Sequence, residues 1–232
     1  MARLDQIAFL KDAGIDLAPF ETRCRWRRFD TDEILVDFDD VSTDVYLILA
    51  GDVRILIRTQ SGKEVILGEM RGGQMFGELA AIDGVSRSAN VTALTRGEVC
   101  VMAASVFREI VFAAPAIADR LLRLLTKRVR ELNARLMEHS VLDLRHRLYS
   151  ELLRLSVPRA GAGGAGNERV VTPPPYLHVL AARIGCRREQ VTREFTTMSQ
   201  EGLVERTRGA LVLKRPDVFE KRIAEAMREE GG

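Results

Sequence analysis

The segment from Pro115 to Ser140 constrains the fold more than any other part of the chain, because it has no internal glycine or proline and is rich in leucine, arginine and alanine. Proline suits the first position of a helix, where its missing N–H group costs nothing. Apolar residues recur there at alternating steps of four and three, which is the spacing of a heptad seam. The seam consists of Ala118, Leu122, Leu125, Val129, Leu132, Leu136 and His139. We therefore predict one long helix between an N-terminal and a C-terminal region.

The apolar seam of this helix has two interpretations. A helix that packs on its own domain shows similar spacing, and Leu121 and Leu124 widen the stripe enough for the helix to do both. Because the pattern is sustained over about three heptads, it favours a homodimer in which the helix pairs with its copy. His139, at the last seam position, fits a fraying helix end better than a ligand.

The region before the long helix indicates a β-rich domain. Residues Arg3 to Gly14 have the pattern of a short amphipathic helix, and residues 22–102 consist of short apolar runs broken by turn signals. The runs are Val45–Leu49, Val53–Ile57 and Val65–Leu67, with a hairpin turn expected at Gln60–Lys63. Short strands separated by glycine-containing turns are typical of a sandwich or barrel-like roll.

Two closely spaced segments of this region, Phe76–Ala80 (Phe-Gly-Glu-Leu-Ala) and Arg87–Ala89 (Arg-Ser-Ala), carry the chemistry of a ribose phosphate site. Glycine lets the backbone approach a ligand closely, and arginine and serine offer donors to phosphate oxygens. A carboxylate beside them does not suit phosphate, but it accepts a hydrogen bond from a sugar hydroxyl. The alternative is that Glu78 and Arg87 form a surface ion pair beside a turn, which would contribute little.

The same segments resemble the phosphate-binding cassette of cyclic-nucleotide-binding domains and match it at its contact positions. The resemblance implies that Gly77 and Glu78 contact the ribose and that Arg87 and Ser88 contact the cyclic phosphate. Leu79, within the same motif, completes the ligand-binding residues predicted in this domain.

The region after the long helix has the pattern of a DNA-binding domain. Leu177–Ile184 has helical apolar spacing, Gly185 ends that helix, and a second helix begins near Arg187. The buried stripe of the second helix consists of Val191, Phe195 and Met198. Gly202–Arg206 and Gly209–Leu213 follow as two short strands around a tight turn, which makes the pattern a winged helix-turn-helix. The wing and its edges carry the basic residues Arg206, Arg208, Lys214 and Arg215, which suit phosphate contacts.

The exposed face of the second helix carries residue types that read base edges, since arginine suits guanine and glutamate accepts from the cytosine amino group. The predicted DNA-contacting residues are Arg187, Arg188, Glu189, Gln190, Thr192, Arg193 and Arg208. The pattern alone is weak, because a glycine can end any helix and alternating arginine and glutamate usually mark a solvated face. Ile184–Arg193 also resembles the recognition segment of the CRP/FNR family of bacterial regulators, which implies that Arg188, Glu189 and Arg193 read a TGTGA half-site. Arg187 departs from that pattern, which has serine there, and would add a phosphate contact or alter the flanking preference.

The resemblance covers about Phe20 to Leu213 and agrees in the order of the parts. It implies an α+β protein with a jelly-roll-like N-terminal β-roll that binds a cyclic nucleotide (residues 1–114). A dimerisation helix (115–140) and a C-terminal winged helix-turn-helix domain (141–232) follow. Within the last region, Leu144–Leu155 is predicted to be a helix and Pro158–Gly166 a flexible turn or hairpin loop without function.

The resemblance also implies how the two regions are coupled. In the family the base of the ligand lies against the long helix. In its best-known member a neighbouring threonine and serine bind adenine, and those positions are Leu132 and Asn133 here. Leucine cannot hydrogen-bond a base, whereas asparagine offers a donor and an acceptor. The expected effector is therefore a cyclic mononucleotide, cAMP first and cGMP second. Repacking around Leu132 would move a hinge near Asp143 and reset the two recognition helices, which enter major grooves about 34–36 Å apart.

Composition narrows the classes of function. The net charge is only +2, so nucleic-acid binding must come from a local patch. The three widely spaced cysteines, Cys24, Cys100 and Cys186, argue against a disulfide framework and against a cysteine-ligated metal. No apolar run is long enough to span a membrane and no signal peptide is evident, so we expect a cytoplasmic protein.

The leading hypothesis is an allosteric bacterial transcription regulator, a homodimer that binds double-stranded DNA and a cyclic nucleotide and needs neither a metal nor another cofactor. RNA polymerase is an expected partner, through a surface that the sequence does not locate. A second hypothesis keeps DNA binding but replaces the cyclic mononucleotide by another effector, such as a cyclic dinucleotide, or by none. A third is an enzyme or enzyme-regulatory subunit on the same roll, but no catalytic triad, metal-ligand cluster or Walker-type loop supports it. A redox or haem sensor is weaker still, since Cys24 has no cysteine or histidine near it in sequence.

Overall fold

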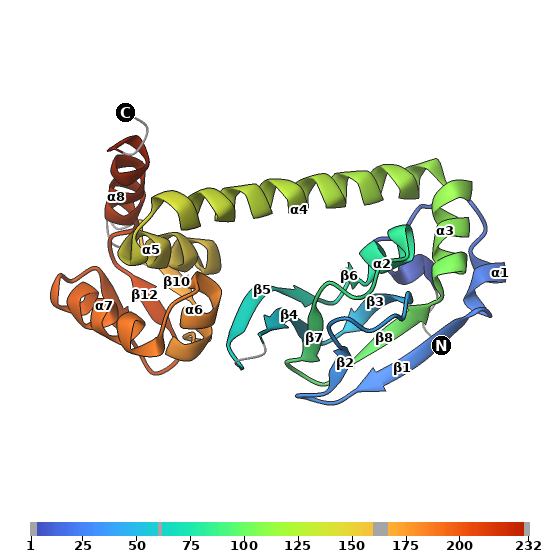
Figure 1. Ribbon diagram of the computed structural model, residues 1–232, viewed down its shortest axis with the longest axis horizontal. Helices are drawn as coiled ribbons and strands as arrows, with labels where there is room; N and C mark the ends of the chain where they lie inside the picture. The colour runs from blue at the N-terminus through green and yellow to red at the C-terminus, as the bar shows by residue number, and fades with distance from the viewer. Residues whose placement is uncertain (1–3, 60–61, 160–166, 230–232) are drawn as a thin grey trace. The chain divides into compact units, whose positions relative to one another are not determined.

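The computed structural model describes residues 4–59, 62–159 and 167–229. The chain, whose elements are labelled in Figure 1, forms two compact units, Met1–Arg128 and Val129–Gly232. Each unit has a hydrophobic core of its own. The boundary between the units falls within the longest helix, α4 (Pro115–Val141), which therefore contributes residues to both.

The N-terminal unit is a β-roll made of two four-stranded antiparallel sheets, as the short apolar runs predict. One sheet has the order β1 (Cys24–Phe29), β8 (Gly97–Met102), β3 (Val45–Ala50) and β6 (Met75–Phe76). The other has the order β2 (Ile34–Val36), β7 (Asn90–Ala93), β4 (Asp52–Arg58) and β5 (Glu64–Arg71). One buried cluster joins the two sheets, with Phe29, Ile48 and Val99 from the first packed with Val53 and Val91 from the second. The predicted β4–β5 hairpin is present, and Gln60 and Ser61 of its turn lie outside the described residues.

The predicted helix over Arg3–Gly14 is wrong. A 3-10 turn, η1 (Leu4–Gln6), is followed only by turns, and α1 (Ala18–Glu21) comes later. The backbone of Asp12 and Gly14 lies at positive φ, 53° and 76°, a conformation that a helix does not contain. The apolar spacing arises instead because the irregular segment is buried in a second cluster, together with residues of α3 (Ala104–Ala113) and α4.

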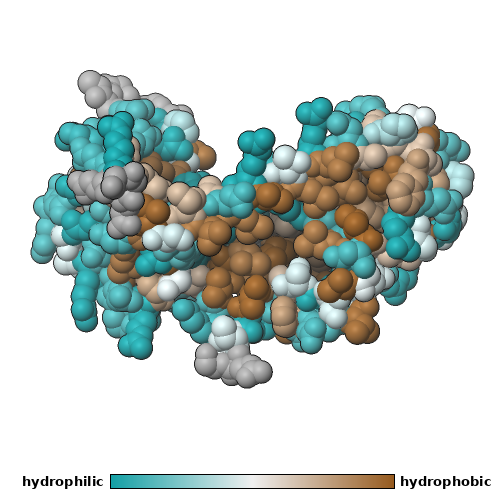
Figure 2. All heavy atoms as spheres, turned by 45° about the horizontal axis from the view of Figure 1, so that its top comes forward, coloured by the Kyte–Doolittle hydropathy of each residue, from teal (hydrophilic) through white to brown (hydrophobic). Residues whose placement is uncertain are grey.

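The long helix predicted over 115–140 is confirmed as α4, which begins at Pro115 as expected. Its first turns pack on the N-terminal unit through Ile117 and Leu121, and Leu124 and Leu125 are partly buried there. Apart from the partly buried Val141 at its end, the remaining large apolar side chains of the helix are exposed in the single chain. They are Leu122, Val129, Leu132, Leu136 and Met137, each more than half exposed. Figure 2, which turns the α4 side of the molecule towards the reader, shows apolar residues gathered over this part of the surface.

The C-terminal unit is a winged helix-turn-helix. Its helices are α5 (Leu144–Leu155), α6 (Leu177–Ile184), α7 (Arg188–Gln200) and α8 (Pro216–Glu229). Its sheet has the order β11 (Val204–Arg206), β12 (Leu211–Leu213), β10 (Arg169–Val171) and β9 (Val157–Pro158). The predictions for α5, α6, α7 and the wing strands are confirmed, whereas α8 was not predicted. The loop predicted over Pro158–Gly166 lies mostly outside the described residues.

Within the described ranges, no helix combines the length and the apolar composition that crossing a membrane requires.

Candidate ligand and DNA-binding sites

Arg87 is a buried cation whose described hydrogen-bond partners are all neutral. Only 4% of the residue is exposed. Its guanidinium donates to the hydroxyl of Ser42 (3.1 Å) and to the carbonyl oxygens of Gly77 (3.2 Å) and Asp44 (2.8 Å), and it lies 5.7 Å from the ring centroid of Tyr46. No described carboxylate forms an ion pair with it. A buried charge is costly unless it is paired, so this arrangement favours an anionic ligand.

The loop before β3 holds the backbone of this arginine. The Arg87 N–H donates to the carbonyl of Asp40 (2.9 Å), and the Arg87 carbonyl accepts from the N–H of Asp39 (3.0 Å). Asp40 in turn accepts from the N–H of Ser42 through its side chain (2.7 Å). Ser42 was not recognised in the sequence, because its role depends on contact with a residue 45 positions away.

Gly77 is required by the close packing around Arg87. It lies at φ 85°, immediately before α2 (Glu78–Asp83). A Cβ atom at this position would lie 2.6 Å from the Asp44 carbonyl oxygen and 2.7 Å from the Nη1 atom of Arg87. Only glycine therefore permits both the turn and the contact with the guanidinium.

Glu78 is a buried carboxylate with one paired oxygen and one unpaired oxygen. The residue is 1% exposed, and its Oε1 atom accepts from Arg128 of α4. The Oε2 atom has no hydrogen-bond partner among the described residues. Burial raises the pKa of Glu78 above the usual range, against the lowering effect of the Arg128 charge. A buried oxygen without a partner is costly, which suits a site that a ligand hydroxyl completes.

Arg128 contacts the candidate site through Glu78, and the sequence analysis missed it. Its second guanidinium nitrogen donates to the Met75 carbonyl (3.0 Å), so the arginine joins α4 to β6 and α2. The available signal was its position one helical turn before Leu132, a residue already predicted to face the ligand.

The structure brings Gly77, Glu78 and Arg87 together and leaves the other predicted residues more exposed. Ser88 is exposed beside Arg87, and Leu79 is 46% exposed on α2. Leu132 and Asn133 belong to the C-terminal unit, where both are exposed on α4.

The helix α7 presents the predicted DNA-reading residues on one face. Val191 and Met198 are buried and Phe195 is partly buried, so the predicted inward stripe is confirmed. Gly185, at φ 71°, ends α6 and makes the turn into α7. The outward residues of α7 and its N-terminal flank are Arg187, Arg188, Glu189, Gln190, Thr192 and Arg193.

Two of these residues also have local roles. The Gln190 side-chain oxygen accepts from the Arg187 N–H (3.0 Å) and so caps the start of the helix. The Thr192 hydroxyl donates to the Arg188 carbonyl (3.0 Å). Arg188, Glu189 and Arg193 remain exposed, and none of them forms an ion pair with a described residue.

The wing separates its basic residues into two groups. Lys214 pairs with Glu168 (3.1 Å) and Glu205 (3.0 Å), and Arg215 pairs with Asp217 (3.2 Å). By contrast, Arg206 and Arg208 are exposed and without an ion pair in the part of the wing that the structure describes. These two residues are therefore the wing cations available to phosphates.

Comparisons with known proteins agree with this architecture. Residues 26–113 match the family "Cyclic nucleotide-binding domain" and residues 146–222 match "Crp-like helix-turn-helix domain". A "CRP-like cAMP-activated global transcriptional regulator" of Mycobacterium tuberculosis is 31% identical over 169 residues, covering 73% of this chain and 74% of the relative.

Solved structures show the same fold. A CooA mutant from Carboxydothermus hydrogenoformans is 18% identical, with a TM-score of 0.77 over 95% of this chain and 98% of that one. The regulator CLP of Xanthomonas campestris, described as c-di-GMP responsive, is 22% identical, with a TM-score of 0.71 over 84% of this chain and 95% of that one.

These matches show a DNA-binding transcription regulator with a cyclic-nucleotide-binding domain, and the relatives are transcription regulators. The chain belongs to the CRP/FNR family.

Proposed function

We propose that the protein is a homodimeric transcription regulator that acts in the cytoplasm and responds to a cyclic mononucleotide, cAMP first and cGMP second. In this proposal Gly77 and Glu78 bind the ribose, and Arg87 and Ser88 bind the cyclic phosphate. Arg128, which already neutralises one oxygen of Glu78, fixes that carboxylate for the ribose hydroxyl.

The observation that carries the proposal is the combination of a buried arginine without a carboxylate partner and a buried carboxylate with a free oxygen. Arg87 needs an anion, and the Oε2 atom of Glu78 needs a hydrogen-bond donor. A ribose phosphate supplies both groups in one molecule. Charge-assisted hydrogen bonds of this kind are about twice as strong as neutral ones.

The second candidate keeps DNA binding and changes the effector. The Mycobacterium tuberculosis relative is described as cAMP-activated, while the Xanthomonas campestris protein of the same fold is described as c-di-GMP responsive. Leu132 and Asn133 do not repeat the adenine-binding pattern, so the base is the least determined part of the proposed ligand.

The homodimer is supported by the exposed apolar stripe of α4. Leu122, Val129, Leu132 and Leu136 repeat at heptad spacing and are 55–66% exposed in the single chain. Pairing two such helices would remove these side chains from water at a gain of about 25 cal/mol per Å² of apolar surface.

The proposal is tested by calorimetric titration with cAMP, cGMP and c-di-GMP, each with and without a duplex carrying an inverted TGTGA repeat. We expect cAMP to bind and to raise the affinity for DNA, with DNA raising the affinity for cAMP by the same factor, as linkage requires. If neither cAMP nor cGMP binds at millimolar concentration, the proposal that the effector is a cyclic mononucleotide is wrong. Binding of c-di-GMP alone would establish the second candidate.

The raised pKa of Glu78 predicts a pH dependence of cAMP binding. The ribose hydroxyl is proposed to donate to the ionised carboxylate, so affinity is expected to fall as the pH drops through the raised pKa. Titrations across this range measure the effect, and Glu78→Gln should bind weakly with no such slope. The carboxyl of Glu78 does not itself destabilise the fold in acid, because a carboxyl whose pKa is raised on folding makes the ligand-free fold more stable as the pH falls. Carboxyls with a lowered pKa, such as Glu168 and Glu201, act in the opposite direction, so thermal unfolding at each pH separates loss of binding from loss of the fold. A wild-type affinity that stays constant from neutral to acidic pH would contradict the role of Glu78.

A further inference from the structure

The recognition helix α7 has two carboxylates on the face that it turns towards the domain. Glu194 and the residue after the helix, Glu201, share that face with Val191 and Met198, because the steps between the four positions are three, four and three. The Glu194 side chain is 24% exposed and that of Glu201 is 32% exposed. Partly buried carboxylates on a helix that binds DNA need partners, since they otherwise repel phosphate.

One arginine of α5 holds both carboxylates. The Nε atom of Arg145 donates to Glu194 (2.7 Å) and its Nη1 atom donates to Glu201 (3.2 Å). The hydrogen bond to Glu194 raises the pKa of Arg145, and the charge of Glu201 adds to this effect. Glu194 and Glu201 are about two helical turns apart along α7. The guanidinium of Arg145 therefore links two separate points on the inward face of this helix.

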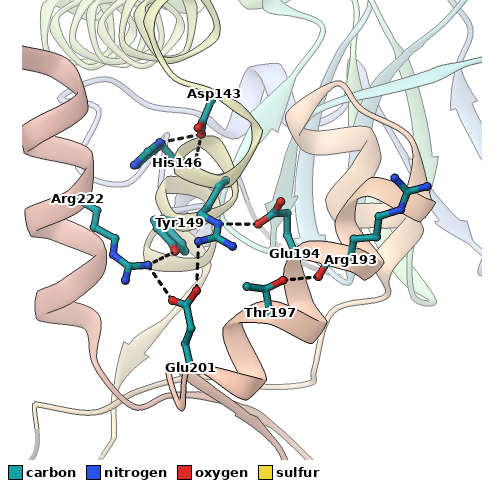
Figure 3. A network of polar contacts seen from close by, with 9 residues as sticks. Asp143, His146, Tyr149, Arg193, Glu194, Thr197, Glu201 and Arg222 are labelled. Atoms are coloured by element: carbon teal, nitrogen blue, oxygen red, sulfur yellow. Dashed lines mark hydrogen bonds and ion pairs between the residues drawn. The ribbon is translucent and has the colours of Figure 1, made fainter. Parts of the chain in front are cut away.

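A second arginine, from α8, completes the chain of charges. The Nη1 atom of Arg222 donates to Glu201 (3.0 Å) and to the hydroxyl of Tyr149 (2.7 Å). Tyr149 is fully buried and its ring stacks on Phe219 of α8, with 4.3 Å between the centroids. Figure 3 shows Arg222, Tyr149 and Glu201 pointing towards one another. The Arg222 end of this row of charged residues is therefore fixed to the hydrophobic core.

The order Glu194, Arg145, Glu201, Arg222 joins α5, α7 and α8 through alternating charges, which we call the ionic ladder. Arg193, a predicted base reader, is adjacent to Glu194 in sequence but points away from the ladder in Figure 3. Rotating α7 about its axis would move Arg193 across the bases and would at the same time break the contacts of Arg145. The ladder therefore opposes the motion that would misplace the DNA-reading side chains.

We propose that Arg145 and Arg222 are positioning residues for DNA reading, fixing the rotation and axial position of α7 through Glu194 and Glu201. This inference rests on the proposed DNA-reading role of α7 and extends it to residues that do not face DNA. The ladder also neutralises two carboxylates that would otherwise weaken binding to any DNA sequence.

The test compares Arg145→Gln, Glu194→Gln and the double variant on two duplexes. One duplex carries the sequence that the wild-type protein selects from a random pool, and the other has an unrelated sequence. On unrelated DNA we expect opposite effects, because Arg145→Gln uncovers negative charge and Glu194→Gln removes it. The ratio of affinities for the selected and unrelated duplexes should fall about tenfold in both single variants, since a misplaced helix loses base contacts. The double variant should recover part of that ratio, because its two amides can hydrogen-bond each other.

Two further variants separate positioning from stability. Arg145→Lys keeps the positive charge but cannot form the hydrogen bonds to both Glu194 and Glu201. It should therefore restore the affinity for unrelated DNA more fully than it restores the ratio of affinities for the selected and unrelated duplexes. Arg159→Gln removes a cation from another ion pair of the same unit, with Glu168 (2.6 Å), and should leave discrimination unchanged. Thermal unfolding identifies any variant that fails to fold.

An unchanged ratio in folded Arg145→Gln and Glu194→Gln would overturn the positioning role. The sequence that the wild-type protein selects tests the proposed TGTGA site separately. If it differs from TGTGA, the ladder variants are compared on the selected sequence. Wild-type protein that selects no sequence would overturn the DNA-reading proposal and the ladder together.

Discussion

Arg87→Leu is expected to lower the affinity for cAMP at least about 100-fold, or ~3 kcal/mol, because each charge-assisted hydrogen bond to the phosphate contributes about 1.5–3 kcal/mol. The leucine also leaves the carbonyl oxygens of Gly77 and Asp44 without the donor that now satisfies them. Calorimetry measures the affinity, and thermal unfolding measures the accompanying loss of stability.

The matched control is Arg58→Leu. Arg58 lies near the end of the β4–β5 hairpin, where its side chain is 41% exposed and pairs with Glu64 (3.0 Å). Removing this surface cation should leave cAMP affinity within about twofold of the wild type. If Arg87→Leu does not fold, Arg87→Lys decides, since it keeps the charge but loses the planar fork and should bind weakly. Wild-type affinity in either folded Arg87 variant would show that the phosphate binds elsewhere.

Features that depend on local backbone chemistry could be predicted from the sequence. Pro115 begins α4, Gly185 ends α6 in the left-handed conformation, and Gly77 precedes α2 at positive φ. Proline restricts φ and glycine permits the positive φ that other residues avoid, so these effects depend little on the rest of the fold. The cassette is also local, since its residues lie within one short stretch.

Features that depend on packing across the chain could not be predicted. The segment Arg3–Gly14 has helical apolar spacing but is held in turns, because burial in the core determines its conformation more than its periodicity does. Arg128 is 50 positions from Glu78, and its contact follows only from the way α4 crosses the cassette. Cys24 has no cysteine near it in sequence, yet it lies on β1 beside β8, which carries Cys100, and the hydrogen bond from Cys100 lowers the pKa of Cys24.

The ionic ladder at α7 likewise could not be predicted from the sequence. The outward face of α7 could be predicted because its residue types suit DNA. On the inward face, Glu194 interrupts an apolar stripe, and nothing in the sequence pairs it with Arg145, which is 49 positions away. The helix that supplies Arg222 was not predicted at all, although it stacks Phe219 on the buried Tyr149. Residues that hold a reading helix in place are thus harder to find than residues that read.

The second prediction with a large expected effect concerns base reading by α7. Arg188→Ala should weaken binding to a TGTGA-type duplex by about 1–3 kcal/mol, or roughly 5- to 150-fold, because arginine binds guanine through two hydrogen bonds in the major groove. The loss of discrimination should be confined to the one base pair that Arg188 contacts. Duplexes altered at that base pair should then bind the variant as well as the unaltered duplex does. Glu189→Ala should relax discrimination at another position by the same reasoning. Fluorescence anisotropy with a set of singly altered duplexes measures these effects.

Arg208→Ala provides the contrasting case, because it removes an exposed cation from the wing and not from α7. A phosphate contact carries no sequence information, so this variant should weaken binding to all duplexes alike and reduce the salt dependence by about one unit of slope. Base reading and phosphate binding are thereby distinguished by which duplexes lose affinity rather than by how much affinity is lost. Arg188→Ala that weakens every duplex equally would place Arg188 on the phosphate backbone, and Arg208→Ala that changes discrimination would bring the wing into a groove. Either result would require α7 to dock differently from the orientation that its exposed face now suggests.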